Sequence, residues 1–403
     1  MPARILHVDL DAFFVEVCRR HHPELREIDL LVVGGRRDQR GVVQSASYGA
    51  RKFGVHAGMP IAQAARLCPA ATFFQGSFPH YREASRAVRE VLLRHSPTVV
   101  MASLDEAYLD FNGTERLHPV SLLPAAERLR DDVRDRTGLD CSIGIGPNRM
   151  IAKLASDAAK PRGLMEIRAG WEEGFLAGLP LRALPGVGPK TAERWAAIGL
   201  TEVIQVQRMN VEELSRLVGD HARDLKFRAH GHGGSTLNAG RSAKSISRET
   251  TLSHDVTDRD RLEGLLALFS AHVAAQLREE SLAARTVTLK LRHGDFHTVT
   301  RRHTLDAPTD LDAEIFAAAR ILFVPAFDEA LLRRQGVRLI GVAATNLVES
   351  APADLFEAPA RTRLRELTVA LDKVRGKFGA DAVTSARILG VKGNRKAERR
   401  SGD

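Results

Sequence analysis

Two short acidic segments of the chain could bind divalent cations. The first is Asp105-Glu106, at the tip of an apolar hairpin that extends from Val99 to Asp110. The second follows a segment that alternates as a β-strand does, with Leu6, Val8 and Leu10 on one face and His7, Asp9 and Asp11 on the other. Carboxylates in such apolar surroundings are costly to bury unless a cation compensates their charge.

If the two segments pair in one sheet, Asp9, Asp105 and Glu106 converge into a site made only of oxygen ligands. Carboxylates, water and substrate phosphates are the ligands that Mg²⁺ prefers. Each segment alone has a simpler interpretation, because an Asp at a strand end often caps a turn and an Asp-Glu pair in a hairpin is often solvated. Both segments occur in apolar β patterns, which favours the metal site.

Composition limits the class of protein. The chain has 403 residues, enough for two to four domains, and its 59 Lys and Arg against 50 Asp and Glu give a net charge of +9. This basic balance suggests a polyanionic partner, although it equally supports solubility. The three cysteines, Cys18, Cys68 and Cys141, form no disulfide or zinc pattern, which indicates a reducing cytoplasm. We expect neither a signal sequence nor a membrane span.

The first half of the chain alternates between strand and helix patterns. Short strands are expected at residues 30–33 and 41–48, and another at 141–146. Helical periodicity marks residues 80–94, 122–136 and 151–159, the usual partners for one face of a sheet. Residues 166–230 show no strand pattern and predict a small helical unit. Its centre is the turn Leu184-Pro185-Gly186-Val187-Gly188-Pro189-Lys190, which opens a helix.

A flexible hinge is predicted at residues 230–235, where a metal site at His230 and His232 is the weaker alternative. Residues 244–345 then read strand, helix, strand, strand, helix, strand. Two of these strands carry hydroxyl and cationic side chains on one face, at Thr286, Thr288, Lys290 and Arg292, and at Thr298, Thr300, Arg302 and Thr304. Such a face suits contact with a phosphate backbone, and equally a solvated surface. A final amphipathic helix is expected at residues 364–378, followed by a basic tail.

Several motifs, in a fixed order, make the chain resemble the Y-family DNA polymerases of the DinB type, the DNA polymerase IV branch. They are Val8-Asp9-Leu10-Asp11-Ala12-Phe13-Phe14, Ser47-Tyr48-Gly49-Ala50-Arg51, Ser103-Leu104-Asp105-Glu106, Ser142-Ile143-Gly144-Ile145-Gly146 with Lys153-Leu154-Ala155, Lys160-Pro161, the turn 184–190, and Lys244-Ser245-Ile246-Ser247. The resemblance covers roughly residues 4–345. It implies DNA-directed, translesion DNA synthesis without a proofreading nuclease.

The resemblance implies an α+β fold shaped as a right hand, with an additional α/β domain called the little finger. The palm would comprise residues 1–10 and 76–165, the fingers 11–75 and the thumb 166–230. A linker would occupy 231–243, the little finger 244–345, and a C-terminal tail 346–403. The small residues Ala46, Ala57 and Gly58 would leave the fingers open above the nascent base pair.

The resemblance also implies roles for individual residues. Asp9, Asp105 and Glu106 would be the catalytic carboxylates, and with the Leu10 carbonyl they would hold two Mg²⁺ ions, for which Mn²⁺ could substitute. Phe14 would be the steric gate against a 2′-hydroxyl, with Phe13 beside it, whereas Asp11 would be structural. The triphosphate of the dNTP would be bound by Ser45, Tyr48, Arg51 and Lys160. Primer-template DNA would contact Gly186, Gly188, Lys190, Lys244 and Ser245.

Partner binding at the C-terminus departs from the family pattern. Members commonly bind the replication sliding clamp through a Gln-x-x-Leu-Phe type of peptide, and here Leu355 and Phe356 are present without the Gln. We expect a monomer. One alternative is a catalytically silent DNA-binding scaffold, which the retained carboxylates oppose. Another is a palm-type nucleotidyl cyclase, which would require neither the turn 184–190 nor residues 244–345.

Overall fold

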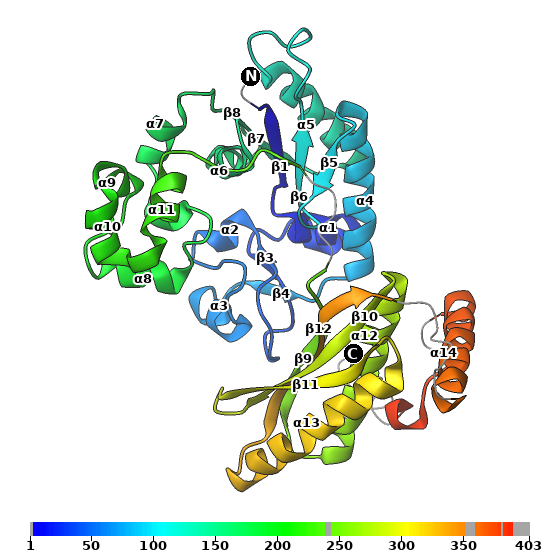
Figure 1. Ribbon diagram of the computed structural model, residues 1–403. Helices are drawn as coiled ribbons and strands as arrows, with labels where there is room; N and C mark the ends of the chain where they lie inside the picture. The colour runs from blue at the N-terminus through cyan, green and yellow to red at the C-terminus, as the bar shows by residue number, and fades with distance from the viewer. Residues whose placement is uncertain (1–2, 238–242, 351–358, 380–381, 390–403) are drawn as a thin grey trace. The chain divides into compact units, whose positions relative to one another are not determined.

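The computed structural model describes residues 3–237, 243–350, 359–379 and 382–389 of the chain. It contains two compact units, Met1–Gly240 and Arg241–Asp403 (Figure 1). The first unit contains a five-stranded and a three-stranded sheet, and the second contains a four-stranded sheet; the main hydrophobic cores of the two units are separate.

A five-stranded sheet lies at the centre of the first unit, in the order β5-β6-β1-β7-β8. Its strands are β5 (Val99–Met101), β6 (Glu106–Asp110), β1 (Ile5–Leu10), β7 (Cys141–Gly146) and β8 (Leu164–Glu166). The central strand β1 is antiparallel to both β6 and β7. The strand predicted at 141–146 is therefore present, whereas the sequence pattern missed β8, a three-residue edge strand.

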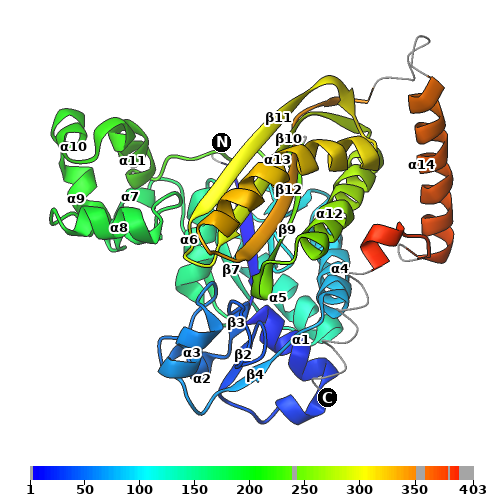
Figure 2. The ribbon, with the colours of Figure 1, turned by 90° about the horizontal axis from the view of Figure 1, so that it is seen from below.

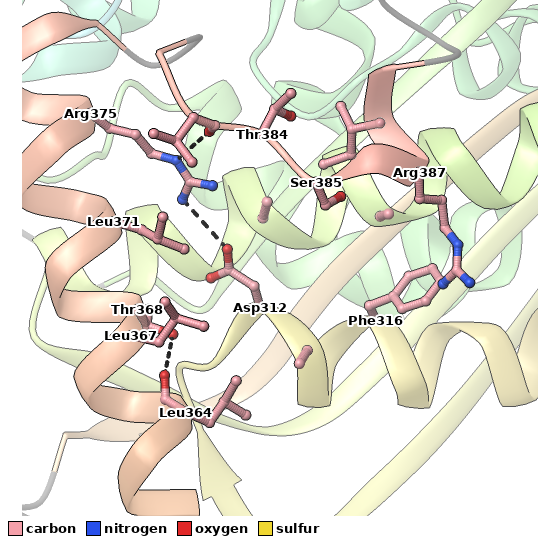
Figure 3. A pocket seen from close by; sticks show the side chains of 15 residues that line it. Asp312, Phe316, Leu364, Leu367, Thr368, Leu371, Arg375, Thr384, Ser385 and Arg387 are labelled. Carbon is pink, nitrogen blue, oxygen red and sulfur yellow. Dashed lines mark hydrogen bonds and ion pairs between the residues drawn. The ribbon is translucent and has the colours of Figure 1, made fainter.

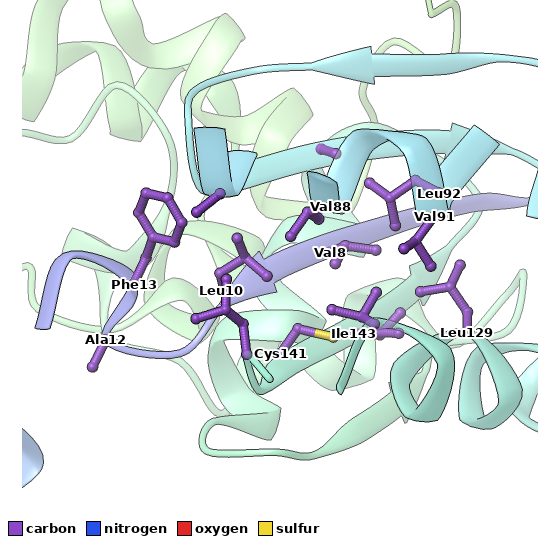
Figure 4. Close-up of a cluster of buried hydrophobic side chains, with 14 of the residues drawn as sticks. Val8, Leu10, Ala12, Phe13, Val88, Val91, Leu92, Leu129, Cys141 and Ile143 are labelled. Carbon is purple, nitrogen blue, oxygen red and sulfur yellow. The ribbon is translucent and has the colours of Figure 1, made fainter. Parts of the chain in front are cut away.

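The two faces of β1 pack against different helices. Leu6, Val8 and Leu10 belong to the main core, together with residues of α4 (Phe78–His95) and α5 (Leu123–Thr137) (Figure 4). The opposite face packs on α6 (Arg149–Ala159), where Ile5 contacts Ala152. Gly144 makes this contact close, because a Cβ at that position would lie 2.0 Å from the Ala152 carbonyl oxygen. Polar side chains of α6 are thereby brought against the polar face of β1.

Residues 13–74 form a smaller layer around the sheet β3-β2-β4. Its strands are β2 (Leu31–Val33), β3 (Ser45–Ala46) and β4 (Thr72–Phe74), and its helices are α1 (Phe13–His21), α2 (Tyr48–Arg51) and α3 (Ile61–Leu67). The predicted strand at 41–48 is therefore too long. The observed strand β3 ends at Ala46, because the next residue, Ser47, caps α2: its hydroxyl accepts a hydrogen bond from the Ala50 N–H. Tyr48 consequently lies on a helix.

The helical unit predicted at 166–230 is present. It contains α7 (Glu172–Ala177), α8 (Pro189–Ala196), α9 (Val203–Arg208), α10 (Val211–Val218) and α11 (Ala222–Ala229). The segment 230–235, predicted to be a flexible hinge, makes two hydrogen bonds to residues at the start of α6. The Asn148 amide donates to the Gly231 carbonyl at 2.7 Å, and the Arg149 N–H donates to the Gly234 carbonyl at 3.2 Å. These bonds hold the segment against the start of α6.

The second unit follows the predicted order of strands and helices. It comprises β9 (Ser245–Val256), α12 (Arg259–Glu279), β10 (Leu282–His293), β11 (Thr298–Thr309), α13 (Asp312–Leu332) and β12 (Val337–Glu349). The sheet order is β11-β10-β12-β9. Val287, Leu289 and Leu291 are fully buried in the core shared with α12 and α13, the two helices that cover this sheet (Figure 2).

The C-terminal helix α14 (Pro359–Phe378) packs on the helical side of the second unit. Arginine-carboxylate pairs hold it there, since Arg278 lies 2.6 Å from Asp372 and Arg361 lies 2.8 Å from Glu314. Arg375 also pairs with Asp312 at 3.6 Å, at the edge of a cavity of about 600 Å³ between α14 and the α12–α13 pair (Figure 3). The predicted amphipathic face is only partly covered, because Leu367 and Phe378 remain exposed.

Candidate active site

The two acidic segments meet across neighbouring strands of the central sheet. Asp9 on β1 is the register partner of Glu106 on β6, and the Leu10 N–H donates to the Asp105 carbonyl at 2.9 Å. Asp9 is only 5% exposed, although it lies one residue from the end of its strand. The expected pairing of the two segments in one sheet is therefore confirmed.

Two lysines neutralise these carboxylates. The Lys160 ammonium lies 2.6 Å from an Asp9 oxygen, and the Lys153 ammonium lies 2.7 Å from a Glu106 oxygen. Asp157 lies between the lysines, 2.9 Å from Lys160 and 4.0 Å from Lys153. The buried negative charge of the site is thus paired by cations that α6 and the residue after it supply.

The third carboxylate, Asp105, is turned into its own loop, where it accepts a hydrogen bond from the Ser103 hydroxyl. Within the described part of the chain, no three His, Cys, Asp or Glu side chains are gathered closely enough to hold a metal ion. The donor chemistry nevertheless fits a hard divalent cation. Asp9 and Glu106 offer carboxylate oxygens on opposed register positions, and Asp105 adjoins them at the hairpin tip.

The surroundings of Asp9 and Glu106 shift the pKa values of these two carboxyl groups in opposite directions. Burial raises the pKa of Asp9 to about 6, although Lys160 opposes that change. The adjacent His7 ring, 3.6 Å away, and the Lys153 ammonium hold the pKa of Glu106 at about 2. Burial lowers the pKa of His7, so the ring is neutral at pH 7. The two opposed carboxylates are therefore held in different environments.

The cations and hydroxyls predicted to bind a triphosphate lie near the end of β1. The Tyr48 hydroxyl donates to Asp11 at 2.9 Å, and the Arg51 guanidinium lies 4.8 Å from the centre of the Tyr48 ring. The Lys160 ammonium contacts β1 by donating a hydrogen bond to the Asp9 carboxylate. The weaker candidate, Ser45, is 5% exposed on β3 and is buried below this surface.

The two adjacent phenylalanines occupy different environments. Phe13, which the resemblance groups with Phe14 at the nucleotide, is 1% exposed and belongs to the core. Phe14 is partly exposed, and its ring packs edge-on against Tyr81 at 4.8 Å and Phe13 at 5.2 Å. The Tyr81 hydroxyl lies 3.2 Å from the Cys18 sulfur. Phe14 is therefore backed by a packed aromatic cluster.

The residues predicted to contact DNA are exposed in both units. In the first unit, Gly186 has φ +88° at the turn, and Gly188 and Lys190 lie at the start of α8. In the second unit, Lys244 and Ser245 are exposed at the start of β9.

The two hydroxyl-and-cation strands of the second unit are direct neighbours. Thr288 pairs with Arg302, Lys290 with Thr300, and Arg292 with Thr298. These side chains share the face of the sheet that α12 and α13 leave uncovered. The proposed clamp peptide with Leu355 and Phe356 lies outside the described residues.

The sequence interpretation missed the roles of Lys153 and Asp157. Lys153, Asp157 and Lys160 are spaced i, i+4 and i+7, which places them on one helical face. That spacing was a usable signal. The strand that this face would meet could not be identified from spacing alone.

Comparison with known proteins agrees with this geometry. Residues 8–157 match the impB/mucB/samB family, residues 243–355 match the C-terminal domain of that family, and residues 178–220 match a SAM-like helix-hairpin-helix tandem. DNA polymerase IV of Caulobacter vibrioides is 40% identical over 387 residues, which cover 96% of this chain and 94% of the relative. DNA polymerase IV of Dehalococcoides mccartyi strain CBDB1 is 38% identical over 390 residues, 96% of this chain and 98% of the relative.

Solved structures show the same similarity. A Y-family DNA polymerase chimera of Dbh and Dpo4 matches with a TM-score of 0.72 and 25% identity, over 86% of this chain and 99% of the other. An insertion ternary complex of Dbh DNA polymerase matches with a TM-score of 0.57 at 25% identity and the same coverage. Both units of the chain are included in the family match, which excludes the cyclase alternative. The chain belongs to the impB/mucB/samB family of Y-family DNA polymerases, in the DNA polymerase IV branch.

Proposed function

We propose that this protein is a template-directed DNA polymerase of the translesion type, which adds dNTPs to a primer 3′ end without proofreading. The observation that carries the proposal is the opposition of Asp9 and Glu106 on β1 and β6 in a member of this family. Primer-template DNA and a dNTP are its substrates. The sheet surface around Arg302 and Lys290 and the turn at Gly186 would contact the DNA backbone.

Asp9, Asp105, Glu106 and the Leu10 carbonyl would hold two Mg²⁺ ions, for which Mn²⁺ could substitute. When bound, such ions activate a hydroxyl nucleophile and stabilise the charge of the leaving group. In the protein without substrates, Lys160 forms an ion pair with Asp9 and Lys153 forms an ion pair with Glu106. We infer that Lys160 leaves Asp9 when cations bind and becomes available to the triphosphate, for which Arg51 offers a planar bidentate fork.

The domain roles follow from this assignment. The palm would be residues 1–10 and 76–165, the fingers 11–75, the thumb 166–230 and the little finger 244–345. Phe14 would exclude ribonucleotides, because its ring is held from behind by Tyr81 and could not retreat from a 2′-hydroxyl without disturbing that packing.

We further propose a monomer that binds the replication sliding clamp and works in the cytoplasm. The buried free thiols of Cys18, Cys68 and Cys141 suit a reducing compartment. Within the described residues, no helix has the length and hydropathy needed to cross a bilayer.

Primer extension tests the proposed function. The purified protein should extend a 5′-labelled primer on an undamaged template and past a template lesion when Mg²⁺ or Mn²⁺ is supplied. A chelator should stop the reaction, and re-added Mg²⁺ should restore it. Absence of extension with either metal, under conditions where the protein binds the primer-template, would contradict the proposal.

A further inference from the structure

Asp11 is a buried carboxylate that the proposed chemistry does not use. It follows β1 directly, shares the polar face with Asp9 and is 5% exposed. Its oxygens accept hydrogen bonds from the Tyr48 hydroxyl at 2.9 Å, the Ser142 hydroxyl at 3.1 Å and the Arg162 backbone N–H at 2.9 Å. A buried carboxylate is tolerated when its lone pairs are satisfied in this way.

The three donors come from separate parts of the first unit. Tyr48 opens α2, Ser142 lies on β7, and Arg162 follows α6 by three residues. Their separations from Asp11 are 37, 131 and 151 residues along the chain. A single side chain therefore ties the small layer of residues 13–74 to the central sheet and to the turn after α6.

The contacts of Asp11 lead to the residues proposed to bind the triphosphate. Burial, and next the Asp11 charge, raise the pKa of the Tyr48 hydroxyl, so this group stays protonated and donates. The Arg51 guanidinium in turn lies over the Tyr48 ring and donates to the Ala46 carbonyl at 2.9 Å. On the other side, Arg162 is two residues beyond Lys160 in the same turn.

The same contacts separate Asp11 from the metal ligands. Asp9 is paired with the side-chain ammonium of Lys160, a partner on a long flexible side chain that a metal ion could displace without breaking a backbone hydrogen bond. Asp11 instead accepts from a backbone N–H, from the buried Ser142 hydroxyl and from the Tyr48 hydroxyl, so its oxygens already have partners within the protein. An ion at Asp11 would have to displace a backbone hydrogen bond.

We propose that Asp11 is a positioning residue for the incoming dNTP: it fixes Tyr48 and Arg51 on one side of the triphosphate and the Lys160 turn on the other. The proposal rests on the polymerase function. It assigns Asp11 an effect on nucleotide affinity and leaves the metal-dependent step to Asp9, Asp105 and Glu106.

Single-turnover insertion of one dNTP on the intact protein tests this assignment, because its concentration dependence separates dNTP Kd from the maximal rate. Asp11→Ala should raise the dNTP Kd by about 10- to 100-fold, and the maximal rate should stay within about threefold of wild type. Asp11→Asn retains one acceptor oxygen and should give an intermediate Kd. Asp135→Asn, an exposed carboxylate on α5, is the matched control and should leave both constants unchanged.

Tyr48→Phe removes only the hydroxyl that donates to Asp11. This variant tests the same contact if Asp11→Ala does not fold. The effects of Asp11→Ala and Tyr48→Phe on dNTP Kd should be less than additive in the double variant, because both break the same contact. Thermal unfolding and DNA affinity, measured in parallel, detect a purely structural defect.

Two results would overturn the assignment while wild type still extends primers. One is an unchanged dNTP Kd in folded Asp11→Ala, or in Tyr48→Phe if Asp11→Ala is unfolded. The other is loss of maximal rate with unchanged Kd, which would place Asp11 in the metal-dependent step. Inactive wild type would instead contradict the polymerase function itself.

Discussion

Asp9 and Glu106 face each other as register partners on adjacent antiparallel strands, and each carboxylate is paired with its own lysine at 2.6 to 2.7 Å. Lys153 lies on α6, which packs against β1, and Lys160 follows the last residue of that helix. Each carboxylate of the proposed metal site is therefore already paired with an ammonium group, which a bound metal ion would have to displace.

Replacing Asp9 by Asn should abolish extension without weakening the metal-free fold. Burial raises the folded-state pKa of Asp9 to about 6, above an unfolded value of about 3.9. Its contribution to stability is therefore full only below the unfolded pKa and is lost as the pH rises through 6. At pH 8 in a chelator, Asp9→Asn should be as stable as wild type or more stable by up to about 2 kcal/mol.

Thermal unfolding of both proteins between pH 5 and pH 8 measures this difference, which should shrink toward pH 5. Lys160 keeps Asp157 as a partner in the variant. A variant that loses more stability at pH 8 than at pH 5 would show that the Lys160 pair, rather than burial, dominates the energy of Asp9.

Phe14→Ala should admit ribonucleotides. A 2′-hydroxyl forced against a packed ring costs about 1–3 kcal/mol, or roughly 5- to 150-fold in rate. Insertion kinetics with matched dNTP and rNTP pairs measure the loss of discrimination. Phe78→Ala removes an exposed ring that also packs edge-on against Tyr81, at 5.8 Å, and serves as the control. If the ratio of dNTP to rNTP insertion in Phe14→Ala equals the wild-type ratio, Phe14 only packs against its neighbours and does not exclude ribonucleotides.

DNA binding should depend strongly on salt and weakly on sequence. The logarithm of the binding constant falls linearly with the logarithm of the salt concentration. Each phosphate contact that is lost makes this negative slope shallower by about 0.9 for duplex DNA. Arg302→Ala, on the uncovered sheet face, should therefore flatten that slope by about 1. Arg363→Ala, an exposed cation on α14, is the control. A wild-type slope near zero would exclude this mode of binding.

Arg278→Ala should loosen α14. The Arg278 guanidinium is largely buried and bridges Asp372 on α14 to Asp312 on α13 at 2.6 and 3.0 Å. Its removal leaves both carboxylates without this partner, and breaking such a partly buried network should cost about 1–3 kcal/mol. Limited proteolysis should then cut within residues 359–378 sooner than in wild type. Arg363→Ala again provides the control, and equal cleavage rates in all three proteins would argue against the bridge.

The sequence predicted the elements whose patterns are local. The alternation in β1 and the six elements of residues 244–345 are present, because period-2 and helical periodicities survive in half-buried elements. β8 was missed since three residues carry too little pattern, and Tyr48 was placed in a strand because the cap at Ser47 was not recognised.

Within the site, residue types and motif order predicted the carboxylates but not their partners. Lys153 lies 47 residues from Glu106, and Arg162 lies 151 residues from Asp11. Such contacts depend on the close packing of α6 on the sheet, which the small Gly144 permits. The burial of Phe13 beside a partly exposed Phe14 likewise depends on how α1 packs, which a Phe-Phe pair does not reveal.

The most direct test of the account is primer extension by Asp105→Ala and Glu106→Ala, with primer-template affinity measured on the same preparations. Both variants should lose all but a few per cent of extension and should bind DNA nearly as well as wild type, because carboxylates hold metal ions while other surfaces hold the duplex. Glu90→Ala, an exposed carboxylate on α4, should behave as wild type. Extension well above a few per cent by both variants would contradict the assignment of these carboxylates to a two-metal polymerase site.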